Sequence, residues 1–282
     1  MVNRILLAER RVQSFEVLSD VTQLAHLQDV SQEPAHILSS DQRYNGNQRS
    51  FSDAWVLGID TSTVVNTGLA RNGQLLVSRH VGDSMNHVEL LAKSVTAVLA
   101  DCEVRYAALS AIGVGVGPGP FTGLRVGIAA AETLGFALGI PVIGVCSLDV
   151  LAAQYADFGA ESAFVVTVDA RRKELYWAEY DMFGRRVGDP QVGAPDTLPD
   201  LPVLGPGVAL YPELLGSRAL FGAPSDLDAG FLAARLAILP HLNLTPLYLR
   251  EPDAALPNRR KSVLANTLRA SKSDVAHQEV VE

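Results

Sequence analysis

Two turns in the sequence carry residue types that could handle a phosphate group. The first is Gly58-Ile59-Asp60-Thr61-Ser62-Thr63, which ends an apolar strand-like run and places one carboxylate beside three hydroxyls. Hydroxyl and backbone donors suit a phosphate, and a carboxylate can reach Mg²⁺ through water. Asp60, Thr61 and Ser62 are therefore candidates for a nucleotide-facing loop. The alternative is that these short side chains only satisfy the backbone groups of their own turn.

The second turn is the glycine-rich run from Gly117 to Arg125. A phosphate loop needs a lysine and a hydroxyl after its last glycine, whereas Leu124 and Arg125 follow Gly123 here. A helix N-terminus at this point could still face an anion. We favour the simpler interpretation, a tight strand-to-helix turn whose glycines permit close backbone packing.

The sequence gives little indication of a metal site or of a nucleophile for acyl transfer. His87 and Glu89 stand two residues apart, so on a helix they point in different directions and cannot share an ion. The two cysteines, Cys102 and Cys146, are too few for a thiolate zinc site or a disulfide framework. The usual serine-nucleophile patterns are missing from the sequence. A reducing cytoplasm is the expected location.

Alternating strands and helices must position these turns. Apolar runs and the Asn72-Gly73 turn signal predict strands at 55–60, 66–70, 74–80, 111–116 and 141–145. Apolar residues at three- and four-residue spacing predict helices at 86–101, 122–138 and 147–155. We expect Ser147 to cap the last of these helices. Two more strands, 163–170 and 174–181, are joined by Arg171-Arg172-Lys173. This order is typical of a mixed α/β protein.

One stretch, Val126 to Cys146, is apolar enough to suggest a membrane span. Gly135, Gly139 and Pro141 interrupt it, so a buried helix followed by a buried strand is the better interpretation. The apolar run at the start of the sequence is too short for an export signal. We expect no contact with a membrane.

Length and composition limit the remaining choices. The 282 residues predict about two domains, and an apolar content of 48% is enough to build a core. A net charge of −8 argues against a protein that coats nucleic-acid phosphates, although it permits membership of an RNA-processing complex. We expect a polar, mobile extension over 1–54, a first lobe over 55–158, a smaller second lobe over 159–250 and a disordered tail over 251–282.

Four segments together resemble the bacterial TsaB (YeaZ) family. They are Leu57-Gly-Ile-Asp-Thr-Ser-Thr63, His87-Val-Glu-Leu-Leu91, Gly117-Pro-Gly-Pro-Phe-Thr-Gly-Leu-Arg-Val-Gly127, and Asp169-Ala-Arg171 with Glu174-Leu-Tyr176. The resemblance covers about 55–250. It implies an actin-like (ASKHA, ribonuclease H-like) α/β fold of two lobes, with mixed sheets flanked by helices. It also implies a role in making threonylcarbamoyladenosine beside the anticodon of tRNAs.

In that family the member resembling this chain is not the transferase. It pairs with its catalytic paralogue TsaD and helps to recruit the ATPase TsaE. The paralogue holds a metal with two histidines one helical turn apart, after a strand like 141–145. By that spacing the two positions here are Ser147 and Leu151, and leucine cannot bind a metal. We therefore expect no metal site and no catalytic residue. Pro120 also departs from the family, which usually has serine there.

The resemblance also suggests which partners to expect. The predicted helices 86–101 and 122–138 would form the subunit interface, because they carry small and apolar residues beyond one buried stripe. The interface residues that we assign are His87, Leu90, Leu91, Ser94, Val95, Val98, Thr122, Leu124, Arg125, Ala129 and Thr133. Expected partners are a TsaD-like catalytic subunit, a TsaE-like ATPase, a second copy when the chain is isolated, and tRNA indirectly through the complex. We expect no tightly bound cofactor, with Mg-ATP only at a subunit boundary.

An alternative hypothesis is an independent actin-like ATPase or phosphotransferase. It would use Asp60, Thr61 and the Gly117–Gly123 turn, with Asp169 as a second carboxylate. An adenosine-binding loop is not recognisable in the sequence, and this disfavours the hypothesis. Tight binding and turnover of Mg-ATP by the chain alone would distinguish it from a scaffold subunit.

Overall fold

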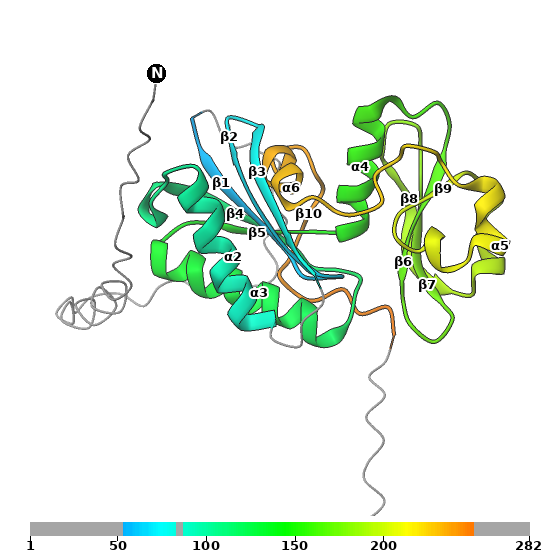
Figure 1. Cartoon of the computed structure of the whole chain (residues 1–282), viewed down its shortest axis with the longest axis horizontal. Helices are drawn as coiled ribbons and strands as arrows, with labels where there is room; N and C mark the ends of the chain where they lie inside the picture. The colour runs from blue at the N-terminus through cyan, green and yellow to red at the C-terminus, as the bar shows by residue number, and fades with distance from the viewer. Residues whose placement is uncertain (1–52, 83–86, 251–282) are drawn as a thin grey trace, which may run out of the picture. The chain divides into compact units, whose positions relative to one another are not determined.

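The computed structural model describes residues 53–82 and 87–250, which belong to one compact unit spanning 48–282. Its strands form two sheets with helices packed against them, so the expected α/β class is observed (Figure 1). The strand order of the first sheet is β10-β5-β4-β1-β2-β3, and that of the second is β8-β7-β6-β9. The expectations for 1–52 and 251–282 lie outside the described residues.

The first sheet combines an antiparallel meander with two parallel strands. The meander consists of β1 (Trp55–Asp60), β2 (Val65–Arg71) and β3 (Gln74–Val81), and both residues of the Asn72-Gly73 turn have positive φ, as the predicted hairpin requires. The parallel strands β4 (Leu109–Gly115) and β5 (Val142–Val145) follow on the other side of β1. This arrangement of three antiparallel and two parallel strands is that of the actin-like, ribonuclease H-like class.

Helices cover both faces of this sheet. On one face lie α2 (His87–Asp101) and α3 (Phe121–Leu138), and on the other lies α6 (Ala229–Arg235) (Figure 1). Successive side chains of β1 alternate between the faces. Leu57 and Ile59 accordingly join the core beneath α2 and α3, whereas Val56 joins the core that includes α6.

The second sheet contains β6 (Phe164–Asp169), β7 (Leu175–Tyr180), β8 (Arg186–Gly193) and β9 (Val203–Leu204). Sequence patterns predicted β6 and β7 but not β8, which contains Pro190. A proline lacks the N–H that a central strand must donate, but β8 lies at the edge of the sheet, where this loss is tolerated. The remaining short elements are η2 (Tyr106–Ala108), η3 (Pro195–Thr197), η4 (Val208–Leu210), α5 (Pro212–Leu215), η5 (Gly216–Arg218) and β10 (His241–Leu242).

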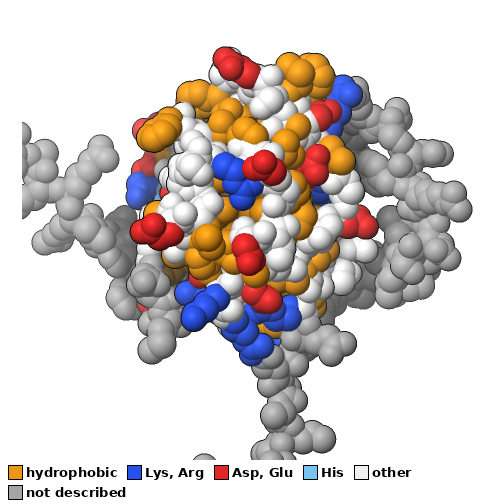
Figure 2. All heavy atoms as spheres, turned by 90° about the vertical axis from the view of Figure 1, so that its right-hand side faces the viewer, with side chains coloured by type: hydrophobic (Ala, Val, Ile, Leu, Met, Phe, Trp, Pro, Cys, Tyr) orange, Lys and Arg blue, Asp and Glu red, His pale blue; other side chains and the backbone are white. Residues whose placement is uncertain are grey.

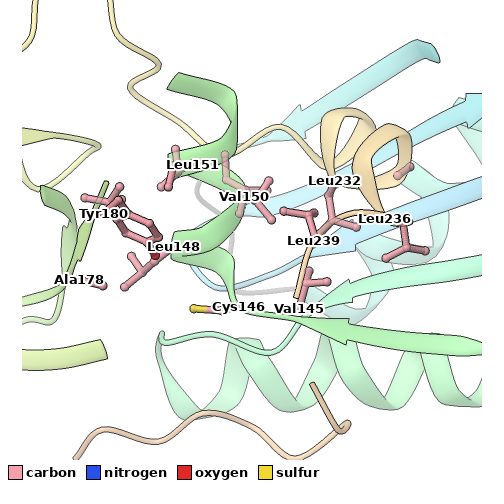
Figure 3. Close-up of a cluster of buried hydrophobic side chains, with 14 of the residues drawn as sticks. Val145, Cys146, Leu148, Val150, Leu151, Ala178, Tyr180, Leu232, Leu236 and Leu239 are labelled. Carbon is pink, nitrogen blue, oxygen red and sulfur yellow. The ribbon is translucent and has the colours of Figure 1, made fainter. Parts of the chain in front are cut away.

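The helix α4 (Ser147–Gly159) joins the two sheets through one core. Leu148 and Leu151 lie toward Tyr180 of β7, and Val150 lies toward Leu232 of α6 (Figure 3). The expected boundary of the second lobe differs from the structure at this point. We assigned 159–250 to that lobe, yet α6 packs on β1–β3 and β10 pairs with β5 of the first sheet.

Among the described residues, α3 is the helix whose length and composition alone would allow it to cross a membrane. About a third of it, 33%, is buried inside the protein, and β5 follows it as a buried strand. The expected buried helix is therefore buried along one face only. The opposite face, which includes Ala129 and Thr133, is exposed and lines the groove described below.

Candidate functional site

The carboxylate of Asp60 lies fully buried at the end of β1. One oxygen, Oδ1, accepts hydrogen bonds from the Ser62 backbone N–H at 2.8 Å and from Ser62 Oγ at 2.6 Å. The other oxygen accepts a bond from Ser147 Oγ at 2.6 Å. Burial raises the pKa of Asp60 above its ordinary value, and the bonds from Ser147 and Ser62 oppose that shift. Ser62 and Ser147 thus supply the three hydrogen bonds that the Asp60 carboxylate accepts.

The side chain of Thr61 also points into the protein. Its hydroxyl donates to the Gly123 carbonyl at 2.8 Å and ties the first turn to the start of α3. A Cβ at Gly127 would lie 2.2 Å from Thr61 Oγ1, and one at Gly119 would lie 2.6 Å from the Ser62 carbonyl oxygen. The glycines therefore permit close backbone packing, and this confirms the simpler interpretation of the second turn.

The two positions compared with a histidine pair both lie at the start of α4. Ser147 donates to Asp60 and is not the N-cap, so the predicted cap is wrong; Cys146 occupies that position without a side-chain capping bond. Leu151 is 1% exposed and belongs to the core (Figure 3). Within 53–82 and 87–250, no three His, Cys, Asp or Glu side chains come together as a metal site.

Sequence reasoning missed a buried polar cluster centred on Asp149 of α4. Its Oδ1 accepts from the Tyr180 hydroxyl at 2.7 Å and from Arg186 at 3.1 Å. Burial raises the pKa of Asp149, and Arg186 opposes the shift. Burial also raises the pKa of the neighbouring Cys146 thiol to about 12, so this thiol stays protonated. The sequence signal that could have revealed this cluster is Asp149 itself, the only charged residue in the apolar run 142–153.

An apolar groove of about 720 Å³ lies between α2 and α3. Its lining residues are Ile59, Leu91, Ala92, Val95, Tyr106, Thr122, Arg125, Val126, Ala129, Ala130, Thr133, Leu134 and Ala137. Among these residues Arg125 carries the only charge. The groove can therefore accept apolar side chains but offers few groups for acid–base chemistry. Such a surface is typical of a protein-binding site.

The structure divides the assigned interface residues between this surface and the core. Thr122, Arg125, Ala129 and Thr133 are exposed, and Leu90 is half-buried. The residues buried in the protein are Leu91, Ser94, Val95, Val98 and Leu124. The Ser94 hydroxyl also forms a hydrogen bond with the Thr67 hydroxyl. Of the buried residues, only Leu91 and Val95 line the groove, where they form its floor. The side chain of His87 lies outside the described residues.

Tyr248 contacts one edge of the groove. Arg125 Nε donates to its hydroxyl at 2.8 Å, and the Phe121 ring lies 4.5 Å from its ring, centre to centre. The backbone N–H of Leu247 donates to the Val116 carbonyl at 2.8 Å. These contacts hold the segment after β10 against the first turn of α3.

Comparisons with known proteins agree with this arrangement. A family model described as TsaD, tRNA N6-adenosine threonylcarbamoyltransferase, matches residues 83–211. An uncharacterized protein of Mycobacterium tuberculosis is 44% identical over 209 residues, which cover 71% of this chain and 93% of that protein. The tRNA threonylcarbamoyladenosine biosynthesis protein TsaB of Bacillus subtilis is 30% identical over 220 residues, which cover 71% of this chain and 95% of that protein.

A solved structure supports the same assignment. The structure described as YeaZ from Pseudomonas aeruginosa has a TM-score of 0.56 and 29% sequence identity, and the match covers 70% of this chain and 100% of that one. Sequence and fold thus agree across most of the described residues. This chain belongs to the TsaB (YeaZ) family of tRNA threonylcarbamoyladenosine biosynthesis proteins.

Proposed function

We propose that this chain is a non-catalytic scaffold subunit of the complex that transfers a threonylcarbamoyl group to the adenosine adjacent to the anticodon of tRNAs. It pairs with a TsaD-like catalytic subunit and helps to recruit a TsaE-like ATPase. The tRNA reaches this chain through the assembled complex, and the complex works in the cytoplasm. Family membership supports the pathway, and the family-model match to TsaD supports the choice of partner.

The groove between α2 and α3 is the observation that carries this proposal. Ala129 and Thr133 are exposed on α3, and Ala92 is exposed on α2. Small side chains allow a partner helix to approach closely, and the apolar floor favours burial of its larger side chains. When the chain is isolated, the same surface pairs with a second copy, because a self-complementary helical face is suited to a two-fold dimer.

The polar turn after β1 supports an accessory role rather than an independent ATPase. Asp60, Thr61 and Ser62 are buried, and their side chains form hydrogen bonds within this chain. An ATPase would need such groups turned toward a bound phosphate and Mg²⁺. At the position of the paralogue's second histidine, Leu151 offers only hydrocarbon. Any Mg-ATP would therefore bind at a boundary with a partner rather than tightly to this chain alone.

Co-elution with the TsaD-like protein of the same organism tests the proposal. Leu91 and Val95 are 2% and 5% exposed, so charged residues there would disrupt the core as well as the groove. Ala129→Arg and Thr133→Arg are sharper variants, because both positions are exposed on the groove wall. We expect either change to abolish co-elution while the circular dichroism spectrum stays that of the wild type.

The matched control is Ala237→Arg, which adds the same side chain at an exposed alanine outside the groove lining. This variant should co-elute with the catalytic subunit as the wild type does. Full co-elution of both groove variants would refute this surface as the interface. Failure of the wild-type pair to associate would refute the scaffold role itself.

A further inference from the structure

The turn between β6 and β7 presents three consecutive cations. Arg171, Arg172 and Lys173 are all exposed, and their φ values are 62°, 55° and 63°. This left-handed region is unfavourable for side chains other than glycine, asparagine and aspartate. A turn that only connects two strands would be less strained with glycine or asparagine at these positions. The presence of Arg-Arg-Lys therefore suggests that these side chains have a function.

Neighbouring residues hold this turn in one conformation. Asp169 Oδ1 accepts the Arg171 backbone N–H at 2.7 Å, and the Glu174 N–H donates to the Arg171 carbonyl at 3.0 Å. From the end of the described chain, Arg250 donates to the Ala170 carbonyl at 2.9 Å and pairs with Glu174. The cations are therefore presented from an ordered base rather than from a loose loop.

The charge of this turn opposes that of the protein as a whole. The chain carries a net charge of −8, so its average field repels a polyanion. The turn lies at the lower end of the second sheet in Figure 1, and Figure 2 shows Lys and Arg side chains gathered along the same lower edge. Asp169 and Glu174 offset part of this charge through Arg171 and Arg250. Within 169–174, three basic residues still outnumber two acidic ones.

We propose that Arg171, Arg172 and Lys173 contact phosphates of the tRNA once this chain is part of the assembled complex. The inference rests on the proposed function, which supplies a tRNA substrate, and it adds a direct contact to it. Adjacent cations on a narrow hairpin tip suit successive phosphates of an RNA backbone, to which they add affinity and orientation without reading sequence. An acidic protein partner is the competing class, and the experiment below distinguishes the two.

The test measures binding of an unmodified tRNA transcript to the complex of the full chain with its TsaD-like partner. The variant replaces Arg171, Arg172 and Lys173 with asparagine, which tolerates positive φ and so keeps the turn while removing its charge. We expect affinity to fall about tenfold or more at moderate salt. We also expect the slope of log K against log salt to decrease by about two to three, roughly one per lost phosphate contact.

The matched control replaces Arg79, Arg105 and Arg185 with asparagine, which removes the same charge away from the β6–β7 turn. Its affinity and salt slope should stay close to those of the wild-type complex. Equal losses in both variants, or no loss in the turn variant, would overturn the RNA contact. If the turn variant binds tRNA normally but no longer binds the TsaE-like ATPase, the turn contacts a protein and the proposal is wrong.

These outcomes are separable from the proposed function. A turn variant that still co-elutes with the TsaD-like subunit but binds tRNA unchanged refutes only the phosphate contact, because pairing depends on the α2–α3 groove. Failure of the wild-type chain to form the complex refutes both proposals.

Discussion

The carboxylate of Asp60 connects three pieces of chain that are far apart in the sequence. It ends β1, accepts two bonds from Ser62 and accepts a third from Ser147 at the start of α4. Gly115 makes room for it, because a Cβ there would lie 1.7 Å from Asp60 Oδ2. In this chain, residues whose types suit a phosphate site stabilise the junction between the first sheet and α4.

Stability should depend on pH through this carboxyl. Burial raises the pKa of Asp60 above 3.8, so the folded state favours the protonated form more than the unfolded state does. The contribution of Asp60 to stability is therefore greatest at low pH and is lost as pH rises through the raised pKa. In Asp60→Asn the site stays neutral, and Ser147 can accept from the new amide instead of donating. We expect a smaller decline in unfolding free energy between about pH 4 and about pH 8 than in the wild type.

Urea unfolding of both proteins at several pH values measures this difference. Asp149, whose pKa burial also raises, contributes to both curves and cancels in the comparison. Parallel stability curves for the two proteins would show that the Asp60 carboxyl does not titrate differently in the folded and unfolded states.

Residue types alone could not show which way these side chains point. The sequence placed Asp60, Thr61 and Ser62 at a strand end, as observed, but a phosphate site and a satisfied turn use the same residues. Leu91 and Val95 present the same difficulty, since an apolar helical stripe is equally suited to a core or to an interface. Only the position of the surrounding elements separates these cases.

At the scale of elements, the contact of α6 with the first sheet depends on two glycines. A Cβ at Gly58 of β1 would lie 1.8 Å from the Ala229 carbonyl oxygen, and one at Gly68 of β2 would lie 2.2 Å from the Gly230 nitrogen. Both clashes are with backbone atoms, so a flexible side chain cannot relieve them. The absence of a side chain at these positions lets the helix lie directly on the strands.

Gly58→Ala should therefore push α6 away from β1 and β2. Overpacking against backbone typically costs about 1–3 kcal/mol, and we expect the upper part of that range. The control is Gly216→Ala, because a Cβ there would meet no neighbouring atom within 4 Å and φ is −59°. That change should alter the unfolding free energy by less than about 0.5 kcal/mol. Equal effects of the two substitutions in urea unfolding would contradict this account of the α6 contact.

Local patterns predicted the elements better than their partners in space. The run Trp55–Asp60 was predicted with its observed bounds, and the helix expected at 122–138 begins one residue earlier, at Phe121. By contrast, the residues that form α6 and β10 were not predicted as elements and fell within the range 159–250 that was assigned to the second lobe. Their contacts with the first sheet are long-range, and those of α6 depend on Gly58 and Gly68. The periodicity of apolar residues along the sequence carries no information about such contacts.

At the scale of the molecule, the two sheets share one core instead of meeting at a polar boundary. Leu148 and Leu151 of α4 pack with Phe164 and Tyr180 of the second sheet, and the same buried cluster continues to α6. The bonds from Tyr180 and Arg186 to Asp149 cross the same junction. Separating the sheets would expose apolar surface and leave the Asp149 carboxylate without these partners, so the two halves should unfold together.

The two tryptophans of the chain can test this cooperativity, because Trp55 lies in β1 and Trp177 lies in β7. Trp177→Phe leaves a probe in the first sheet, and Trp55→Phe leaves one in the second. In each variant, tryptophan fluorescence and far-ultraviolet circular dichroism should give the same urea midpoint. Leu148→Ala, which opens a cavity in the shared core, should lower both midpoints together and cost about 2–5 kcal/mol. A fluorescence midpoint that departs from the circular dichroism midpoint in either variant would mean that each lobe unfolds separately, and that α4 links the sheets without coupling them.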